Sequence, residues 1–315
     1  MSFRFPNVKA TLECDRPPRL PAPPCVRPPG TLQWGPLHHE RADHCHDVDL
    51  CRRARFPVAP DLARNKRDIA RDYEISAVEY ARYADPLVYR YVTAPLATVL
   101  ADVSGPILEV ASGTGALGRQ LINVVALDLV REQLLQNPIA RRVQADVDHL
   151  PFRANSFAVT ASAFGMNHFP DPYAAIAEMA RVAPVVAVIT WQRPETPFPP
   201  KQIVLDVIEH LAGRARTRAG EIIEELSETI GTQSAISDVL SAASLRPEVE
   251  VVEAEVPWPG TQAFIDYRLS MSGVVSLIDA DEVRRVATRE IDALPQESLV
   301  WRPRLVLGVG RREPV

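Results

Sequence analysis

The spacing of hydrophobic and polar positions changes twice along the chain. Residues 1–60 show no apolar periodicity, whereas from about Asp61 apolar and aromatic residues recur three or four positions apart. That spacing is typical of an amphipathic helix, here interrupted at Pro86 and Pro95. From residue 106 onward, short apolar runs alternate with helical segments. The alternation predicts an α/β, Rossmann-like fold built on a doubly wound, mostly parallel sheet.

Five of the predicted strands precede residue 192, at 106–111, 124–128, 142–146, 157–163 and 184–191. The fifth is almost wholly apolar, which is typical of a central strand buried on both faces. Helices are predicted between the strands, at 116–123, 131–136 and 171–182. The third helix has the clearest start, because Asp171 can cap it and Pro172 fits its first turn.

A proline-rich stretch at 194–200 separates the fifth strand from a helix-rich region. Helical segments are predicted at 202–211, 219–230, 234–245, 261–271 and 280–294. Strands at 247–256 and 305–309 would complete a sheet of about seven strands. We expect the additional helices to form a cap over the carboxyl edge of the sheet.

The first 60 residues lack the pattern of a folded segment. Seven prolines between positions 17 and 29 exclude a helix there and remove strand donors. We therefore predict a disordered, proline-rich tail over 1–60 and no metal site. A cluster of histidines and cysteines at 38–51 leaves zinc binding open as the alternative, although the cluster contains no Cys-x-x-Cys pair.

Composition favours a soluble, cytoplasmic protein. No apolar run approaches the roughly 20 residues of a membrane span, and no secretory segment is evident. The formal net charge is −5, and residues 1–60 carry 9 Lys/Arg against 6 Asp/Glu, so the acidic excess lies in the rest of the chain. A net acidic body argues against nucleic acid as a partner. The oligomeric state stays open.

The stretch 107–115, Ile-Leu-Glu-Val-Ala-Ser-Gly-Thr-Gly, carries the main chemical signal. An apolar strand runs into a turn of small residues and then the start of a helix, which is a common place for a nucleotide-like ligand. As far as Gly118, the loop matches Gly-x-Gly-x-x-Gly, the fingerprint of dinucleotide binding. On its own, this fingerprint is only a weak indication of NAD.

Two acidic residues shift the prediction from NAD to S-adenosylmethionine. Glu109 lies directly before the loop, where its carboxylate would repel a pyrophosphate but tolerate a positively charged sulfonium. Asp128 ends the second strand 15 residues after Gly113, short of the ~20 residues expected for NAD. A carboxylate at that position can still accept hydrogen bonds from both hydroxyls of an adenosine ribose.

Four segments, in order, resemble the class I S-adenosylmethionine-dependent methyltransferases. Within that class they look like the small-molecule branch typified by the ubiquinone/menaquinone-biosynthesis C-methyltransferases. The resemblance extends from about Tyr73 to Trp191. Its segments are Leu-Glu-Val-Ala-Ser-Gly-Thr-Gly (108–115), Val-Ala-Leu-Asp (125–128), Gln-Ala-Asp-Val (144–147) with Leu-Pro-Phe (150–152), and Asn-Ser-Phe (155–157) leading to Phe-Gly-Met-Asn-His-Phe-Pro-Asp (164–171).

The resemblance implies S-adenosylmethionine as cofactor and a set of residues that bind it. Gly113 and Gly115 would let the backbone approach the methionine moiety, with Glu109 anchoring that region. Asp128 would bind the ribose and Asp146 the adenine amino group, although either carboxylate alone could be a helix cap or a solvated loop residue. The full set of implied positions is Glu109, Ala111, Gly113, Gly115, Asp128, Leu129, Asp146, Val147 and Ala163.

Two features depart from the family's pattern. The family usually opens the loop with glycine, whereas this chain has Ala111, so we expect no positive φ at that position. The helix predicted over 116–123 is only about 12 Å long, and the helical segment over 131–136 is also short. Both features bear on how tightly the cofactor is held.

Methyl transfer requires alignment of acceptor and methyl group in a water-poor pocket, and a base only where the acceptor must lose a proton. His168 is the candidate catalytic base, because it follows the fourth strand at the carboxyl edge of the sheet. Its alternative role is structural, capping the region of the helix that begins at Asp171 or packing beside Phe169. Tyr80 and Tyr83 either close the pocket or pack in the core. An aromatic-rich cap favours an aromatic or isoprenoid acceptor, unless these residues form interdomain core instead: Trp191, Phe198, Trp258, Phe264, Tyr267 and Met271.

We therefore predict a methyltransferase domain over 61–315, with a cofactor-binding core at 100–192 and a cap with the final strands at 193–315. The expected reaction moves a methyl group from S-adenosylmethionine to an oxygen or carbon of a small, largely apolar acceptor. Two alternatives stay open. One is an NAD-dependent oxidoreductase that uses the same loop, and the other is a non-catalytic protein that retains the fold.

Overall fold

A seven-stranded sheet forms the centre of the protein in a computed structural model that describes residues 62–271, 273–274 and 278–313. The strand order is β3-β2-β1-β4-β5-β7-β6, and β7 alone runs antiparallel to its neighbours. The predicted mostly parallel α/β sheet is thereby confirmed. The predicted proline-rich tail and its zinc alternative lie outside the described residues.

The strands match the predicted apolar runs to within a few residues. Strands β1, β2, β4 and β5 are buried along almost their whole length, whereas the edge strand β6 alternates between exposed and half-buried positions. This contrast follows from helices covering both faces of the parallel strands. The bounds are β1 Ile107–Val110, β2 Val124–Asp128, β3 Arg142–Gln144, β4 Val159–Ala163, β5 Val185–Trp191, β6 Arg246–Glu253 and β7 Arg304–Arg311.

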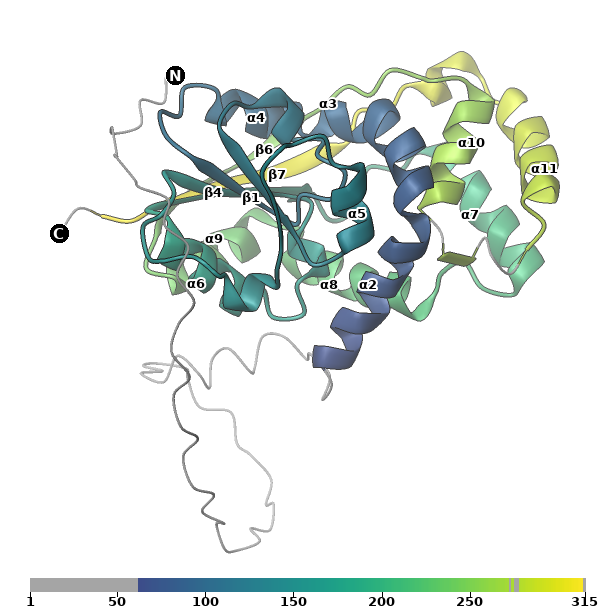
Figure 1. Cartoon of the computed structure of the whole chain (residues 1–315). Coiled ribbons are helices and arrows are strands. Elements are labelled where there is room, and N and C mark those ends of the chain that lie inside the picture. Colours follow the sequence, from purple (N-terminus) through teal and green to yellow (C-terminus); the bar gives the residue numbers. More distant parts are fainter. Residues whose placement is uncertain (1–61, 272, 275–277, 314–315) are drawn as a thin grey trace, which may run out of the picture.

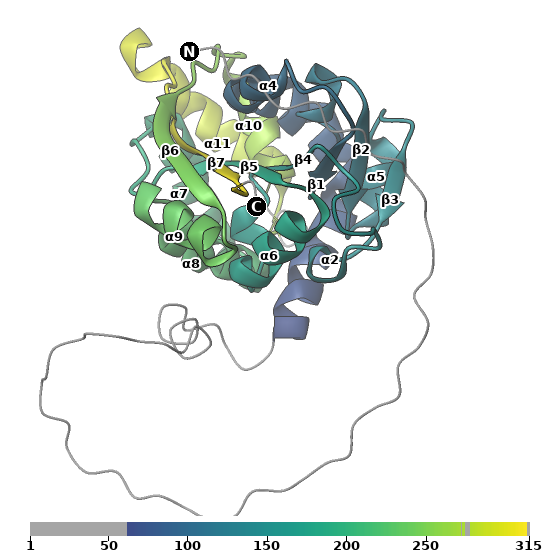
Figure 2. The same cartoon turned by 90° about the vertical axis from the view of Figure 1, so that its left-hand side faces the viewer.

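Helices cover both faces of the sheet and divide the core into two layers. On one face lie α3 (Arg90–Val92) and α4 (Ala94–Leu100), and on the other lie α6 (Pro172–Val182) and α9 (Gln233–Ala242) (Figure 1 and Figure 2). The predicted cap of α6 is confirmed, because the Asp171 side chain accepts a hydrogen bond from the Ala174 N–H at 2.9 Å. Alternate residues of each central strand point into opposite layers, so both faces are apolar.

Beyond the carboxyl ends of the parallel strands lies a second group of helices. Three of them, α7 (Pro199–Ala212), α10 (Thr261–Ser270) and α11 (Ala280–Asp292), pack on one another at the side of the molecule where these strands end (Figure 1). Helix α8 (Arg218–Ile230) packs against α2 (Leu62–Glu79), and α5 (Arg131–Gln136) flanks β2. Helix α9 departs from the expected cap, because its apolar face packs against β6 and β7 beside α6.

The predicted interruption at Pro86 is wrong. Helix α2 continues into η1 (Tyr80–Tyr89), a π-helical segment that contains Pro86 and leads directly into α3. A proline ring clashes with the carbonyl four residues earlier in an α-helix, and the wider π-helical turn moves that carbonyl away. The chain is therefore helical without interruption from residue 62 to residue 92. This continuous helix carries Tyr73, Tyr80 and Tyr89 towards the sheet edge.

The predicted helix over 116–123 is also wrong. Only one 3-10 turn forms, at η2 (Gly118–Gln120), and the chain is extended again at Leu121. Ile122 is 76% exposed, so the end of this segment has no apolar contact to stabilise a longer helix. Asn123 then adopts a positive φ and leads into β2.

Ala111 adopts the left-handed conformation that we expected it to avoid, with φ of 52°. The turn after β1 brings the Ser112 N–H onto the Leu127 carbonyl of β2 at 3.0 Å, and this turn requires the positive φ. An alanine in this region costs roughly 1–2 kcal/mol relative to its ordinary conformations. The family's glycine and this chain's alanine thus serve the same backbone geometry.

The substitution Ala111→Gly should leave the free energy of unfolding within about 0.5 kcal/mol of the wild type, or raise it. Relief of strain offsets the greater entropy that glycine gives to the unfolded chain. Ala177→Gly is the matched control, because it lies inside α6 with no such strain, and it should lose about 1 kcal/mol. Urea unfolding measures both variants. A loss at Ala111 as large as that at Ala177 would contradict the strain argument.

Candidate functional site

The glycine loop between β1 and η2 exposes its backbone at the carboxyl edge of the sheet. Gly113 and Gly115 have φ of 48° and 91°. A Cβ on Gly115 would lie 2.7 Å from Asn137 Oδ1, whereas one on Gly113 would meet nothing closer than 3.7 Å. Gly115 is therefore required both for its backbone angle and for its close packing. Gly113 is required for its angle and leaves open space beside the loop.

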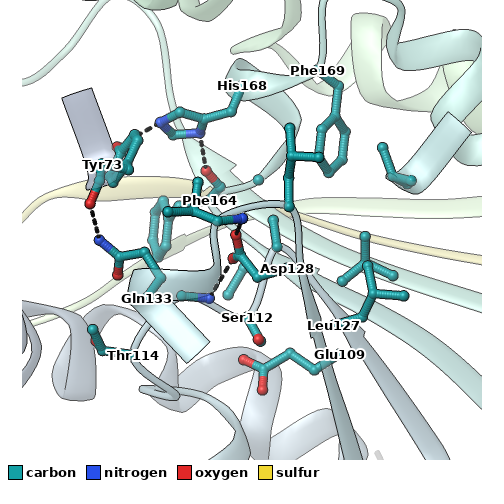
Figure 3. Close-up of a pocket in the computed structure, with 18 of the residues that line it drawn as sticks. Tyr73, Glu109, Ser112, Thr114, Leu127, Asp128, Gln133, Phe164, His168 and Phe169 are labelled. Carbon is teal, nitrogen blue, oxygen red and sulfur yellow. Dashed lines mark hydrogen bonds between the residues drawn. The ribbon is translucent and has the colours of Figure 1, made fainter. Parts of the chain in front are cut away.

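Asp128, at the end of β2, holds the loop in place. Its Oδ2 accepts a hydrogen bond from the Gly113 N–H at 2.8 Å, and its Oδ1 accepts one from the Val130 N–H at 2.8 Å (Figure 3). Burial raises the pKa of Asp128, and hydrogen bonds from the Val130, Gly113 and Leu129 backbones oppose that rise. The carboxylate is thus buried but satisfied by backbone donors.

Glu109, inside β1, is the least satisfied carboxyl group of the site. It is 2% exposed, and its Oε2 has no hydrogen-bond partner. Burial raises its pKa to about 8, a rise opposed by a hydrogen bond from the Gly118 backbone and reinforced by the charges of Asp85 and Asp128. A Cβ on Gly118 would lie 2.6 Å from Glu109 Oε2, so glycine leaves room for this carboxyl group.

Side-chain hydrogen bonds also connect η1 to the glycine loop. Asp85, which is 1% exposed, accepts hydrogen bonds from the Thr114 hydroxyl at 3.0 Å and from Arg119 at 2.5 Å. Arg119 also donates to the Thr114 carbonyl at 2.9 Å. Burial raises the pKa of Asp85, and Arg119 opposes the rise. The loop is therefore anchored from η1 as well as from β2.

Asp146, after β3, is held by an ammonium group from α2. Lys66 Nζ lies 2.8 Å from both oxygens of Asp146 and 2.5 Å from Asp148 Oδ2. Burial by itself lowers the pKa of Lys66, but the hydrogen bonds to the two carboxylates raise it overall. Helix α2 thus crosses the same sheet edge and reaches the end of β3.

His168 makes two hydrogen bonds that fix its protonation. Its Nδ1 lies 2.8 Å from the Phe164 carbonyl, which can only accept, so Nδ1 carries the proton. Its Nε2 therefore accepts the Tyr73 hydroxyl at 2.7 Å (Figure 3). Burial lowers the pKa of His168 to about 4, with the Phe164 carbonyl opposing, and burial raises the pKa of Tyr73. Both side chains are neutral near pH 7.

These elements enclose one cavity of about 130 Å³ at the sheet edge. Gly115 supports the loop but does not reach the cavity wall. The other predicted positions all line it: Glu109, Ala111, Gly113, Asp128, Leu129, Asp146, Val147, Ala163 and His168.

Sequence reasoning missed several residues of this wall. Lys66 and Tyr73 come from α2, and Gln133 of α5 donates to the Tyr73 carbonyl at 3.0 Å. Tyr73 belonged to the predicted apolar stripe of its helix, which gave no sign of a polar role. Nothing in the sequence indicated a role for Lys66, because a single lysine in an amphipathic helix is ordinarily exposed to solvent. Tyr83 lies outside the lining, whereas Tyr80 belongs to it.

A second cavity, of about 170 Å³, adjoins the first through a shared wall of four residues: Tyr73, Tyr80, Tyr89 and His168. Of the aromatic residues predicted to line an acceptor pocket, only Trp191 reaches it, together with Met271. The others pack mainly on one another, with ring centroids of Phe198 and Phe264 5.5 Å apart and those of Trp258 and Phe264 5.1 Å apart. These aromatic residues of the cap therefore belong to the hydrophobic core. The second cavity is lined largely by other side chains.

Comparison with known proteins and the geometry of the site both favour a methyltransferase domain. The family described as a methyltransferase domain matches residues 108–184, from β1 to the end of α6. This stretch of the chain is similar to the class I S-adenosylmethionine-dependent methyltransferases that the four sequence segments resemble. The predicted family is thus confirmed, and the matched stretch contains every predicted cofactor-binding residue.

Relatives of this chain include ubiquinone/menaquinone biosynthesis C-methyltransferases (UbiE). That of Stutzerimonas stutzeri is 39% identical over 93 residues, which cover 24% of this chain and 36% of the relative. That of Ectopseudomonas mendocina is 26% identical over 195 residues, covering 54% of this chain and 70% of the relative. The more similar match therefore spans about a third of its relative's length.

One solved structure supports the fold independently. It is a protein from Anabaena variabilis assigned as a methyltransferase of an antibiotic biosynthesis pathway. The alignment covers 69% of this chain and 95% of that one, with a TM-score of 0.51 at 12% sequence identity. Within the ranges that the structure describes, no helix combines the length and apolarity needed to cross a membrane. No group of three His, Cys, Asp or Glu in those ranges is arranged to hold a metal ion.

The unpaired Glu109 carboxyl group fits a cationic cofactor. S-adenosylmethionine carries an ammonium and a sulfonium group, and a nearby cation favours the ionised carboxylate. Without such a cation, the pKa of Glu109 is raised to about 8, so its carboxyl group is mostly protonated at pH 7. Binding of an ammonium-bearing ligand close to it at pH 7 is therefore coupled to loss of a proton.

Binding of S-adenosylhomocysteine at pH 7 should release close to one proton in the wild type and almost none in Glu109→Gln. Calorimetric titration in two buffers of different ionisation enthalpy measures this release. Glu297→Gln is the control, because that residue is exposed and far from the loop in sequence. Equal proton release in wild type and Glu109→Gln would assign the proton to another group.

The same pKa shift sets the pH dependence of stability. Because the folded pKa of Glu109 is raised to about 8, its contribution is fully favourable below the ordinary carboxyl range and declines as pH rises towards 8. The free energy of unfolding of Glu109→Gln should therefore exceed that of the wild type increasingly between pH 5 and pH 8.

Proposed function

We propose that this methyltransferase transfers a methyl group from S-adenosylmethionine to an oxygen or carbon of a small acceptor held in the second cavity. The observation that carries the proposal is the junction of the two cavities at the Tyr73–His168 hydrogen bond. In this proposal, residues 100–192 bind the cofactor, and residues 193–315 complete the sheet and shape the acceptor site.

The residues of the first cavity suit the parts of the proposed cofactor. When bound, S-adenosylmethionine supplies a methyl group on a positively charged sulfur, which makes that carbon electrophilic. Glu109 offers an unpaired carboxyl oxygen to the methionine end. Asp128 offers its lone pairs to the ribose, in addition to the backbone hydrogen bonds that it already accepts. Asp146 and Val147 face the adenine end.

Lys66 adds a feature that the family pattern did not suggest. Its ammonium group occupies both oxygens of Asp146, so the adenine amino group must share or displace this contact. Such competition lowers cofactor affinity, whereas the closure of α2 over the cavity excludes water from it. Lys66 therefore links cofactor binding to the position of α2.

The same carboxylates argue against the NAD alternative. Glu109 and Asp128 are buried within the loop region where a pyrophosphate would lie. Among the described residues that line the cavity, Lys66 is the one Lys or Arg, and it is already bonded to Asp146 and Asp148. A dianionic pyrophosphate at this place would face unscreened negative charge once Glu109 ionises. The site thus favours a cofactor that brings positive charge.

Asp128→Asn should weaken S-adenosylhomocysteine binding about 10- to 100-fold, since a hydrogen bond to a charged acceptor contributes ~1.5–3 kcal/mol. Asp102→Asn, at an exposed turn before β1, should bind like the wild type. Calorimetry with S-adenosylhomocysteine and with NADH measures both. Tighter binding of NADH would favour the oxidoreductase. Millimolar binding of S-adenosylhomocysteine without turnover on any acceptor would favour the non-catalytic alternative.

The Tyr73–His168 pair offers a route for a proton. An acceptor hydroxyl beside Tyr73 can pass its proton to the tyrosine oxygen while the tyrosine proton moves to His168 Nε2. The Phe164 carbonyl holds the imidazole in the tautomer that leaves Nε2 free to accept. His168 acts in this route through Tyr73, and both residues line both cavities.

Tyr73→Phe and His168→Ala should each lower kcat at least 100-fold with an acceptor that must lose a proton, in the range typical of acid–base catalysis. Binding of S-adenosylhomocysteine should stay within about threefold. Because the pKa of His168 is about 4 and that of Tyr73 is raised, wild-type kcat should show no inflection near pH 6.5.

Formation of S-adenosylhomocysteine from labelled cofactor, with acceptors found by screening phenols and quinols, measures this turnover. Tyr91→Phe in α3 is the control, since it removes a hydroxyl outside both cavities. Wild-type turnover in both Tyr73→Phe and His168→Ala would make the pair structural.

A further inference from the structure

The second cavity is lined by a cluster of basic side chains that the expected apolar acceptor does not use. Arg193 follows β5, Lys201 lies in the first turn of α7, and Arg268 lies near the end of α10. Arg216, just before α8, also lines the cavity and lies 3.7 Å from Glu224, so segments far apart in the sequence bring four cations to it. A cluster of this kind in a partly buried site is costly without a counter-charge.

The acidic groups near this wall already have partners. Glu195 forms an ion pair with Lys201. Arg193 lies 3.0 Å from Glu224 and 3.2 Å from Glu228. Asp72, on the α2 side of the cavity, accepts a hydrogen bond from the Thr217 hydroxyl at 2.6 Å. None of these carboxylates forms an ion pair with Arg268, although the charge of Arg268 helps to lower the pKa of Glu195.

Arg268 has an unmet hydrogen-bonding requirement without an ion pair to offset it, whereas Arg193, whose Nε is also buried without a partner, has two ion pairs. Arg268 forms no ion pair with any other described residue, and its Nε is buried without a hydrogen-bond partner. Its guanidinium carbon lies 5.5 Å from the Tyr267 ring centroid, so the side chain is held at the cavity wall by an aromatic face. Burial lowers the pKa of Lys201, and the charge of Arg268 lowers it further.

We propose that Arg268, with Lys201 and Arg193 beside it, binds an anionic group of the acceptor, a carboxylate or a phosphate. The planar guanidinium presents donors in the geometry that both anions accept. This inference rests on the proposed function, because it assigns the second cavity to the acceptor. It replaces the expected, largely apolar acceptor with one that carries a negative charge.

The residues that line the second cavity suit both the anionic end and the reacting end of such an acceptor. Tyr73 and His168 lie on the wall shared with the cofactor cavity, where the methylated atom would be. Tyr80, Tyr89 and Trp191 add aromatic surface, with the Tyr89 and Trp191 rings 6.3 Å apart. An acceptor with an apolar or aromatic body and an anionic end fits these surfaces together.

Ligand-observed fluorine NMR tests the inference on the full-length protein saturated with S-adenosylhomocysteine. The probes are 4-fluorobenzoate, 4-fluorophenyl phosphate, the neutral 4-fluorobenzamide and the cationic 4-fluorobenzylamine. At least one anion should bind at least tenfold more tightly than the amide and the amine. Comparison of the two anions distinguishes carboxylate from phosphate.

Variants locate the binding. Arg268→Gln should weaken binding of the preferred anion about tenfold or more, and Arg268→Lys should retain part of it, because the charge remains. Arg285→Gln on the exposed side of α11 is the control and should bind like the wild type. Thermal melting of each variant verifies that it is folded.

Three results would overturn the inference: no binding of either anion at millimolar concentration, equal binding of the amide or amine, or undiminished anion binding by folded Arg268→Gln. S-adenosylhomocysteine binding separates these failures from failure of the proposed function. If S-adenosylhomocysteine binds and the anions do not, only the acceptor inference is wrong. If S-adenosylhomocysteine itself does not bind, the proposed function is wrong as well.

Discussion

Three carboxyl groups buried around one glycine loop are the constraint on which the site depends. Asp85, Glu109 and Asp128 are 1%, 2% and 9% exposed. Each buried charge costs several kcal/mol unless it is paired or hydrogen-bonded. Asp85 pairs with Arg119 and Thr114 through Oδ2, and Asp128 has backbone N–H groups. Asp85 Oδ1 and Glu109 Oε2 are each buried without a hydrogen-bond partner. Because Asp85 already has an ion pair with Arg119, Glu109 is the carboxyl group that a further cation would stabilise most.

This constraint explains the backbone of the loop. Asp128 accepts the Gly113 N–H only because the chain turns sharply after β1, with positive φ at Ala111 and again at Gly113 and Gly115. Gly118 then passes close to Glu109 with no side chain in the way. An alanine at position 111 tolerates this path with some strain. The turn therefore forms without glycine as its first residue.

The sheet, and the acidic and glycine positions that line the first cavity, were predictable because their determinants are local. Short apolar runs specify buried parallel strands, and acidic residues directly after these runs must meet at one edge. The helix expected over 116–123 failed because local propensity was not matched by an apolar surface to bury, as the exposure of Ile122 shows. The interruption expected at Pro86 failed because η1 is wound more widely than an α-helix.

Lys66 and Tyr73 were not predictable for a different reason. Their roles come from α2 crossing the sheet edge, which places Lys66 on Asp146 and Tyr73 on His168. These contacts join residues 80 and 95 positions apart. No periodicity within α2 encodes what it will meet at that edge. The tautomer of His168, on which any proton transfer depends, follows in the same way from the Phe164 carbonyl.

The acceptor side shows how aromatic content alone can mislead. Most aromatic residues of the C-terminal region satisfy one another, as the stacked rings of Phe198 and Trp301, 5.2 Å apart, illustrate. The second cavity is distinguished by charge, because four cations line it and the glutamates around them already form ion pairs. A buried, unpaired guanidinium donor is costly in the free protein and favourable only with a bound anion. The chemistry of the acceptor is therefore better inferred from the unmet hydrogen bond of Arg268 than from the apolar residues near it.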